Sequence, residues 1–200
     1  GQPRLYKVWN VPPAGEADTD HLGLLAQELT SGRNSRLYKR LVFDDQIATN
    51  VGAFVSDGEI GSQFMIIATA KPGQDLAEIE AIIDEEVARL LADGPTAIEL
   101  ERARTSTGSG YVRGLERIGG FGGKSDLLAE GEVYHNDPGA WRTSYPRVLD
   151  ARPADLVAAG REWLMDGSYT LEVLPFPEYA AAPTGADRSQ MPAATEMPMA

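Results

Sequence analysis

The sequence predicts a two-layer α+β fold, in which a mostly antiparallel sheet carries its helices on one face. The patterns follow the order strand, helices, two strands, several helices, strand, which does not alternate as the βαβ units of a parallel sheet do. Asp57-Gly58 lies between two β-rich runs and indicates the tight reversal of an antiparallel hairpin. With 42% hydrophobic residues among 200, the chain can bury one good core without cross-links.

Period-two and helical patterns define the elements of the first half. Residues 5–11 alternate apolar and polar side chains up to Pro12-Pro13, which predicts an opening strand. Leucines at helical spacing from Asp18 predict a helix that is broken at Ser31-Gly32. The other elements expected in this half are a short helical stretch around Leu37 and Leu41, strands over 47–55 and 60–70, and a helix from Asp75 to Leu91.

Capping signals and glycines divide the second half. Gly94-Pro95 ends the preceding helix, and Thr96 with Glu99 forms a capping-box pattern that starts a long one. We expect this helix to continue through the small residues 105–110. The later elements expected are helices around 127–128, 141–149 and 153–164 and a closing strand over 169–174. The range 180–200 lacks Leu, Ile, Val, Phe, Tyr and Trp, so we expect one domain over 1–179 and a linker or tail over 180–200.

Charge and composition exclude several classes of protein. Eighteen basic against 30 acidic residues give a net charge of −12, which disfavours nucleic acid and anionic membrane surfaces as partners. No apolar run is long enough for a membrane span, so we expect no membrane insertion. The chain has no cysteine, which excludes disulfides, thiolate zinc sites, iron–sulfur clusters and a cysteine nucleophile.

Residues for metal or nucleophilic chemistry are sparse. The two histidines, His21 and His135, lie far apart in the sequence and outside any His-Glu-x-x-His pattern, so we interpret them as surface or helix-end residues. The acidic pairs are typical of solvated helix faces and lack the donor pattern of a calcium loop. No Gly-x-Ser-x-Gly elbow follows a predicted strand. We therefore assign no catalytic and no metal-binding residue, and substrate-binding residues stay unidentified.

A glycine run ends in the Gly-Lys-Ser of phosphate-binding loops, at Gly123-Lys124-Ser125. The template requires a glycine where this chain has Ile118, and a buried strand where 113–117 predicts helix. Nucleotide binding is the alternative that rests on this run alone. The simpler interpretation is a flexible or kinked break between two helical stretches at 119–123.

Several short pieces of the sequence occur together in a recognisable order. They are Leu25-Ala26-Gln27-Glu28-Leu29, Ser35-Arg36-Leu37-Tyr38, the run 46–54, Glu99-Leu100-Glu101-Arg102-Ala103, and Pro153-Ala154-Asp155-Leu156. This order resembles the pitrilysin/insulinase-type zinc metallopeptidases, whose members typically show a helix, Ser-Arg-Leu-aromatic, a second helix and then a strand, and the likeness extends over about 5–176. The resemblance implies one of the repeated α+β units whose two halves enclose a peptide-binding chamber.

The same resemblance implies which kind of unit this is. The zinc unit carries His-x-x-Glu-His, which this chain lacks. A second feature of the family is an Arg and a Tyr seven positions apart, which assist the substrate carbonyl. The matching positions hold Val42 and Thr49, and Arg40 is offset by two residues. We therefore expect a zinc-free structural unit, excised from a longer chain and following the zinc unit, with no cofactor of its own and zinc in the parent protein.

The leading hypothesis is a non-catalytic structural or substrate-chamber domain of a zinc metalloendopeptidase. Its partners would be the zinc-bearing domain, the second half of the parent chain and a peptide substrate, and the isolated domain could form a homodimer. The apolar run 64–68 should be buried on both sides or pair with a neighbour. The alternative is a stand-alone, zinc-free partner or core-like structural subunit of the same fold. By resemblance, the location would be the bacterial periplasm or cell envelope.

Overall fold

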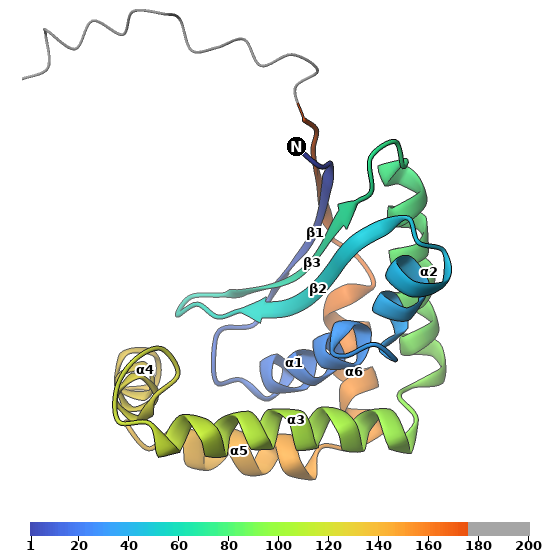
Figure 1. Ribbon diagram of the computed structural model, residues 1–200. Coiled ribbons are helices and arrows are strands. Elements are labelled where there is room, and N and C mark those ends of the chain that lie inside the picture. The colour runs from blue at the N-terminus through green and yellow to red at the C-terminus, as the bar shows by residue number, and fades with distance from the viewer. Residues whose placement is uncertain (176–200) are drawn as a thin grey trace, which may run out of the picture.

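The computed structural model describes residues 1–175 and contains a four-stranded antiparallel sheet in the order β2-β3-β1-β4. The strands are β1 (Arg4–Val11), β2 (Ala48–Ser56), β3 (Ser62–Ala70) and β4 (Tyr169–Val173). The closing strand pairs with β1, so the end of the described chain lies beside its beginning (Figure 1). The antiparallel prediction is confirmed. The predicted tail over 180–200 lies outside the described residues.

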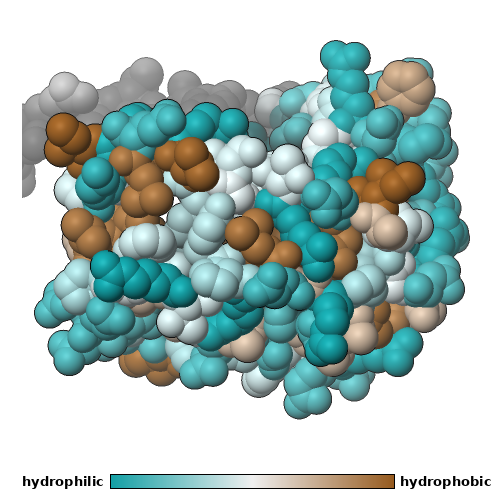
Figure 2. Space-filling view, turned by 90° about the horizontal axis from the view of Figure 1, so that it is seen from below, coloured by the Kyte–Doolittle hydropathy of each residue, from teal (hydrophilic) through white to brown (hydrophobic). Residues whose placement is uncertain are grey.

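The helices cover one face of the sheet, which confirms the two-layer prediction (Figure 1). They are α1 (Ala17–Thr30), the π-helix η1 (Tyr38–Asp44), α2 (Leu76–Asp93), α3 (Ala97–Glu116), α4 (Lys124–His135), α5 (Trp141–Asp150) and α6 (Pro153–Leu164). Seen from the helical side, the surface is mainly hydrophilic, with hydrophobic side chains in separate patches (Figure 2). Among the described residues, no helix combines the length and apolar character that crossing a membrane requires.

The core lies between the inner face of the sheet and α1, α2 and α6. Alternate residues of the central strands point into it, because successive side chains of a strand face opposite sides. Phe64 and Ile66 of β3 are fully buried, whereas Met65 and Ile67 lie half-buried on the other face. Burial of the run 64–68 within this chain is therefore complete on one side only, and its contact with a neighbouring unit stays a prediction.

Lys7 is a charged exception on the inner face of β1. Its side chain is 6% exposed, and its ammonium lies 2.9 Å from Glu80 and 2.6 Å from Asp84, both in α2. Thr170 of β4 donates a second hydrogen bond to Glu80, at 2.7 Å. A buried charge is tolerated when it is paired in this way, and the cluster connects the strands β1 and β4 to α2.

The predicted capping signals act as the sequence indicates. Asp75 accepts a hydrogen bond from the Ala77 amide at 2.9 Å and starts α2. Thr96 and Glu99 form both bonds of a capping box at the start of α3. Arg36, from the Ser-Arg-Leu segment, donates to both carboxylate oxygens of Glu99, at 2.9 and 3.0 Å. The motif that follows α1 thus holds the first turn of α3.

The structure refines one local prediction and corrects another. The short stretch around Leu37 and Leu41 is a π-helix, in which the Asp45 amide bonds to the Arg40 carbonyl five residues earlier. The hairpin connection spans 57–61 and is not a tight two-residue turn. The Gly58 carbonyl accepts from the Ala14 amide at 3.0 Å, and its own amide bonds to the Ser62 hydroxyl. These bonds to neighbouring segments hold the wider loop.

Candidate functional site

A cavity of about 710 Å³ lies between the β2–β3 hairpin, α1 and the helices α3, α4 and α5. This volume is within the range of roughly 300 to 1,000 Å³ that is typical of ligand sites. Its walls combine carboxylates with aromatic rings from segments that are far apart in the sequence. The residues that matter below are Asp20, Asp57, Tyr111, Glu130, Tyr134 and Ser144.

The cavity exists because α4 is held away from the sheet. In Figure 1, α4 lies at the end of α3, beyond the tip of the hairpin. Gly131 is its one buried residue, and a Cβ there would lie 2.6 Å from the Asp137 carbonyl oxygen. The end of α4 is therefore packed tightly against its own following loop. Few other apolar side chains of α4 reach the core, and a hollow remains between the helix and the sheet.

A polar network forms the floor of the cavity. Arg147 donates to Asp20 at 2.7 Å and to the Gly15 carbonyl at 2.9 Å, and Ser144 donates to the other Asp20 oxygen at 2.5 Å. Burial raises the pKa of Asp20, while the hydrogen bonds from Ser144 and Arg147 and the charge of Arg147 oppose the rise. Bonded on both oxygens, this carboxylate is fixed in place.

Two further carboxylates face the cavity without such bonds. Asp57 belongs to the hairpin loop and Glu130 to α4, and within the described residues neither takes part in a hydrogen bond or ion pair. Burial raises the pKa of Asp57, the negative Asp20 adds to the rise, and His135 opposes it. Burial likewise raises the pKa of Glu130, and Asp126 and Asp57 add to it. The walls therefore carry negative charge that the chain leaves largely uncompensated.

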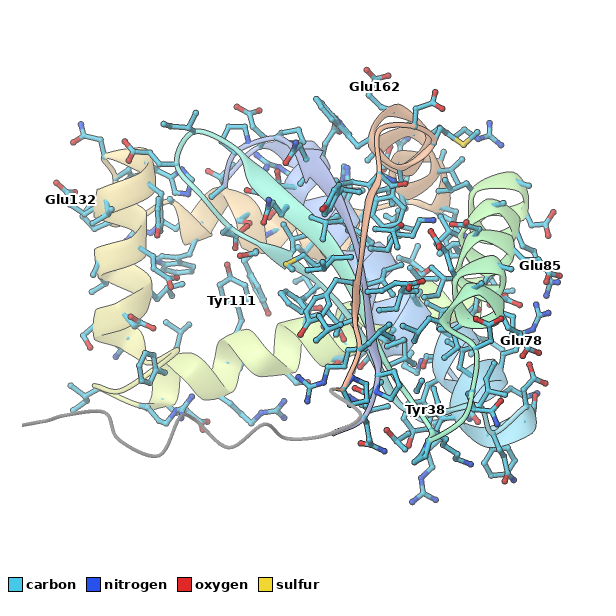
Figure 3. The ribbon with its side chains drawn as sticks, turned by 90° about the horizontal axis from the view of Figure 1, so that it is seen from above. Tyr38, Glu78, Glu85, Tyr111, Glu132 and Glu162 are labelled. Carbon is cyan, nitrogen blue, oxygen red and sulfur yellow. The ribbon has the colours of Figure 1, made fainter. Side chains whose placement is uncertain are left out.

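Aromatic rings complete the walls. Tyr111 points from α3 into the space between α4 and the sheet (Figure 3). Its ring centroid is 5.2 Å from that of Tyr145, and burial raises the pKa of its hydroxyl. Tyr134 and Trp141 line the same cavity from α4 and α5. Flat rings beside carboxylates can hold a ligand that is apolar along its length and cationic at its end.

The donors for a metal site are not assembled. His135 ends α4 and lines the cavity, and His21 lies in α1 outside the lining. Within residues 1–175, no group of three or more His, Asp or Glu side chains could hold a metal ion. Zinc, which the resemblance places in the parent protein, therefore finds no set of ligands that fits it among these residues. That no residue here is catalytic stays a prediction.

The positions that match the Arg/Tyr pair of the family are engaged otherwise. Val42 packs against the core, and the Thr49 hydroxyl donates to the Thr69 carbonyl at 3.2 Å. Arg40 lies in η1 and forms ion pairs of 2.7 and 2.9 Å with Glu85 and Glu86 of α2. None of these side chains lines the cavity.

The Gly-Lys-Ser segment starts α4 at Lys124, as predicted for a break between helices. It follows the helix α3 and a loop, whereas a phosphate-binding loop follows a buried strand. The Gly122 amide donates to the Asp126 carboxylate at 2.7 Å. This loop amide is therefore already bonded to a carboxylate of the chain itself, which argues against the nucleotide alternative.

Sequence reasoning missed the cavity. Asp20, Asp57, Tyr111 and Glu130 come from α1, the hairpin loop, α3 and α4, and no regular spacing connects them. The one available signal was the low apolar content of 105–126, which indicates elements that cannot pack tightly. That signal predicts loose packing and does not identify the lining residues.

Comparisons with known proteins find one matching family model and several solved structures of the same fold. The family model described as the peptidase M16 inactive domain matches residues 1–107. The structure of an inactive peptidase domain from Bordetella parapertussis has a TM-score of 0.78 and 24% identity, over 88% of this chain and 94% of that one. A protease from Helicobacter pylori has a TM-score of 0.77 and 22% identity, over 87% of this chain.

The periplasmic protease PqqL from Escherichia coli shares the fold at a TM-score of 0.60 and 15% identity, over 87% of this chain and 19% of that one. This chain spans 41% of the Helicobacter pylori chain. A search of curated protein sequences finds no match. At these identities the solved structures establish the fold alone.

Proposed function

This chain belongs to the peptidase M16 family as one of its inactive domains, and from that premise we propose that it serves a zinc metalloendopeptidase as a non-catalytic domain. Peptide hydrolysis would take place in a separate His-x-x-Glu-His unit, where zinc activates a water molecule and a glutamate acts as the base. This chain would support that unit and form part of the wall of the peptide chamber. The observation that carries the proposal is the match to the inactive-domain model.

The outer face of the sheet supports a docking role. The register places Tyr6, Val8, Met65, Ile67 and Leu171 on the side away from the helices. Leu171 is 45% exposed, although it adjoins Tyr6 across the sheet. The outward positions of the strands carry no acidic residue, in a chain with a net charge of −12. Arg4 is the charged residue at the end of this face. A largely apolar face with a polar rim is typical of a surface that binds another protein unit.

We assign this outer sheet face to the catalytic unit of the parent protein. The isolated chain could also use the face to form a homodimer. Leu171→Glu should weaken the association, because it places a negative charge among the apolar side chains of β4 and β1 on this face. Thr170→Ser is a suitable matched control, since Thr170 points to the inner side and its hydroxyl bond to Glu80 can be kept.

The test is to isolate the native protein with an antibody against this chain and to measure its mass and zinc content. A mass several times 21.5 kDa with about one zinc would support the proposal. A native mass near 21.5 kDa without zinc would contradict it and favour the alternative, a stand-alone structural subunit of the same fold. We propose the bacterial periplasm or cell envelope as the location, which cell fractionation tests with the same antibody.

A further inference from the structure

We propose that the cavity between the β2–β3 hairpin and α4 binds the side chain of a lysine or arginine on a peptide. The inference rests on the proposed function in one respect, namely that a chamber-wall domain meets peptides. The preference for a positive charge follows from the cavity itself. Three features of the cavity support this preference: its charge, its shape, and the residues that are already fixed at its floor.

The first argument is the balance of charge. The carboxylates of Asp20, Asp57, Glu130 and Asp137 line the cavity. Arg147 alone forms an ion pair with one of them, Asp20, among the described residues. Asp57 comes from the hairpin loop and Glu130 from α4, and the negative Asp57 adds to the rise in the pKa of Glu130. A cation placed between them would relieve this repulsion and regain interactions that the free chain lacks.

The second argument is the shape and the apolar surface. A cavity of about 710 Å³ is too large for one small ion, and its donors do not form a three-ligand cluster. Lysine and arginine have a long apolar stem that ends in a charge, and such a stem packs well on aromatic rings. Tyr111 and Tyr134 supply those rings. Trp141 lines the cavity too, and its ring centroid already lies 5.5 Å from the guanidinium of Arg142, so this ring accepts a cation–aromatic contact within the chain itself.

The third argument is that the floor of the cavity is fixed. Arg147 and Ser144 hold Asp20 through hydrogen bonds. Ser144 also lies beside Tyr111. A Cβ on Gly15 would lie 2.2 Å from the His135 ring, so the loop before α1 sits directly against the end of α4. Binding to groups that are already in position costs less entropy than binding to mobile ones.

The experiment uses two peptides of eight residues that differ at one position, arginine in one and the uncharged analogue citrulline in the other. Isothermal titration calorimetry measures their affinity for the 200-residue chain at low salt. We expect the arginine peptide to bind at least about tenfold more tightly, and the difference to shrink as salt is added. Equal affinities, or no binding of either peptide at millimolar concentration, would overturn the proposal.

A matched pair of variants locates the site. Glu130→Gln and Glu132→Gln remove the same charge from the same helix, but Glu132 points away from the cavity (Figure 3). We expect Glu130→Gln to lower the affinity for the arginine peptide several-fold and Glu132→Gln to leave that affinity unchanged. If both substitutions lowered the affinity equally, the loss would reflect the net charge of the chain, and the assignment of the binding site to this cavity would be overturned. Thermal melting of both variants establishes that they are folded.

A third arm separates the source of the cation. Free agmatine carries the same guanidinium without a peptide backbone. We expect it to bind more weakly than the arginine peptide, and equal or tighter binding would overturn the peptide part of the proposal. The mass and zinc content of the native protein do not depend on these titrations, so failure of the cavity proposal and failure of the proposed function are distinguishable.

Discussion

The helices α2 and α4 differ in how many of their residues are buried, and no sequence motif predicts so large a difference. In α2 eight residues are buried against the sheet and α6, whereas in α4 the one buried residue is Gly131. Hydrophobic side chains of α4 and the loop before it are exposed, with Phe121 at 97% and Val133 at 64%. The part around α2 is thus a close-packed core, whereas α4 contributes almost nothing to that core.

The difference in packing separates the part of the molecule that stabilises the fold from the part that can bind a ligand. Close packing leaves no room for a ligand, so the part built on α1, α2 and α6 determines the fold. The loosely packed part leaves a cavity and exposes its polar groups there. The family model covers 1–107, which includes α1 and α2 but not α6, while Tyr111, Glu130 and Tyr134 all lie beyond it.

The strongest test of this comparison truncates one leucine in each part. Leu25 is fully buried in α1, and Leu128 of α4 is 40% exposed. We expect Leu25→Ala to lower the free energy of unfolding by about 3 kcal/mol, because it loses buried surface and leaves a void. Leu128→Ala should cost less than about 0.5 kcal/mol. Urea unfolding followed by circular dichroism measures both, and similar costs would show that α4 is packed as firmly as α1.

A smaller effect on stability is expected from Glu28, an ionisable residue inside the packed part. It is 1% exposed, and within the described residues neither carboxylate oxygen has a hydrogen-bond partner. Burial raises its pKa to about 8, the nearby Glu99 adds to the rise, and Arg36 and Arg102 oppose it. Between pH 4.5 and 8 the folded chain thus keeps a proton that the unfolded chain has lost. The free energy of unfolding should fall as pH rises through this window.

Glu28→Gln removes that dependence. We expect the variant to be more stable than the original chain by about 2 kcal/mol at pH 9 and nearly equal to it at pH 4. Chemical unfolding across this pH range measures the difference. Glu132→Gln, which removes a charge from an exposed position, is the control. If Glu28→Gln and Glu132→Gln show the same pH profile, Glu28 is ionised at neutral pH and paired in solution.

The smallest expected effects come from a pair of helical glycines. Nothing lies within 4 Å of a Cβ built on Gly110 of α3, whereas one on Gly131 of α4 would meet backbone at 2.6 Å. Gly110→Ala should stabilise the chain by about 0.5 to 1 kcal/mol through helix propensity. Gly131→Ala should destabilise it by about 1 kcal/mol, because the following loop must move. Thermal unfolding compares them, and a gain in both would mean that α4 is not held by its loop.

Much of the fold could be predicted from local signals. The alternation in β1, the leucine spacing in α1 and the capping box at Thr96 each depend on neighbours in the sequence, so pattern and structure agree. The π-helix could not be predicted from helical periodicity, and its Arg40 pairs with Glu85 and Glu86 from an element almost fifty residues later, a contact that local patterns do not contain. The hairpin loop deviates for the same reason, since Gly58 bonds to Ala14.

The cavity could not be predicted for a related reason. Its acidic residues look like ordinary solvated side chains in the sequence, and only the folded chain brings Asp20, Asp57 and Glu130 to one space. Family resemblance did not help, because the features it supplies concern zinc and the Arg/Tyr pair. Val42, Thr49 and the two histidines show where those features are missing, and they do not indicate what the chain has in their place.

The central claim is that this chain is a domain without catalysis of its own. The most direct test is to supply the purified 200-residue chain with zinc and measure both bound metal and hydrolysis of a mixture of fluorogenic peptides, beside the native protein. We predict no stoichiometric zinc and no hydrolysis by the chain alone, and chelator-sensitive hydrolysis by the native protein. Chelator-sensitive cleavage by the chain itself, with about one bound zinc, would contradict the account.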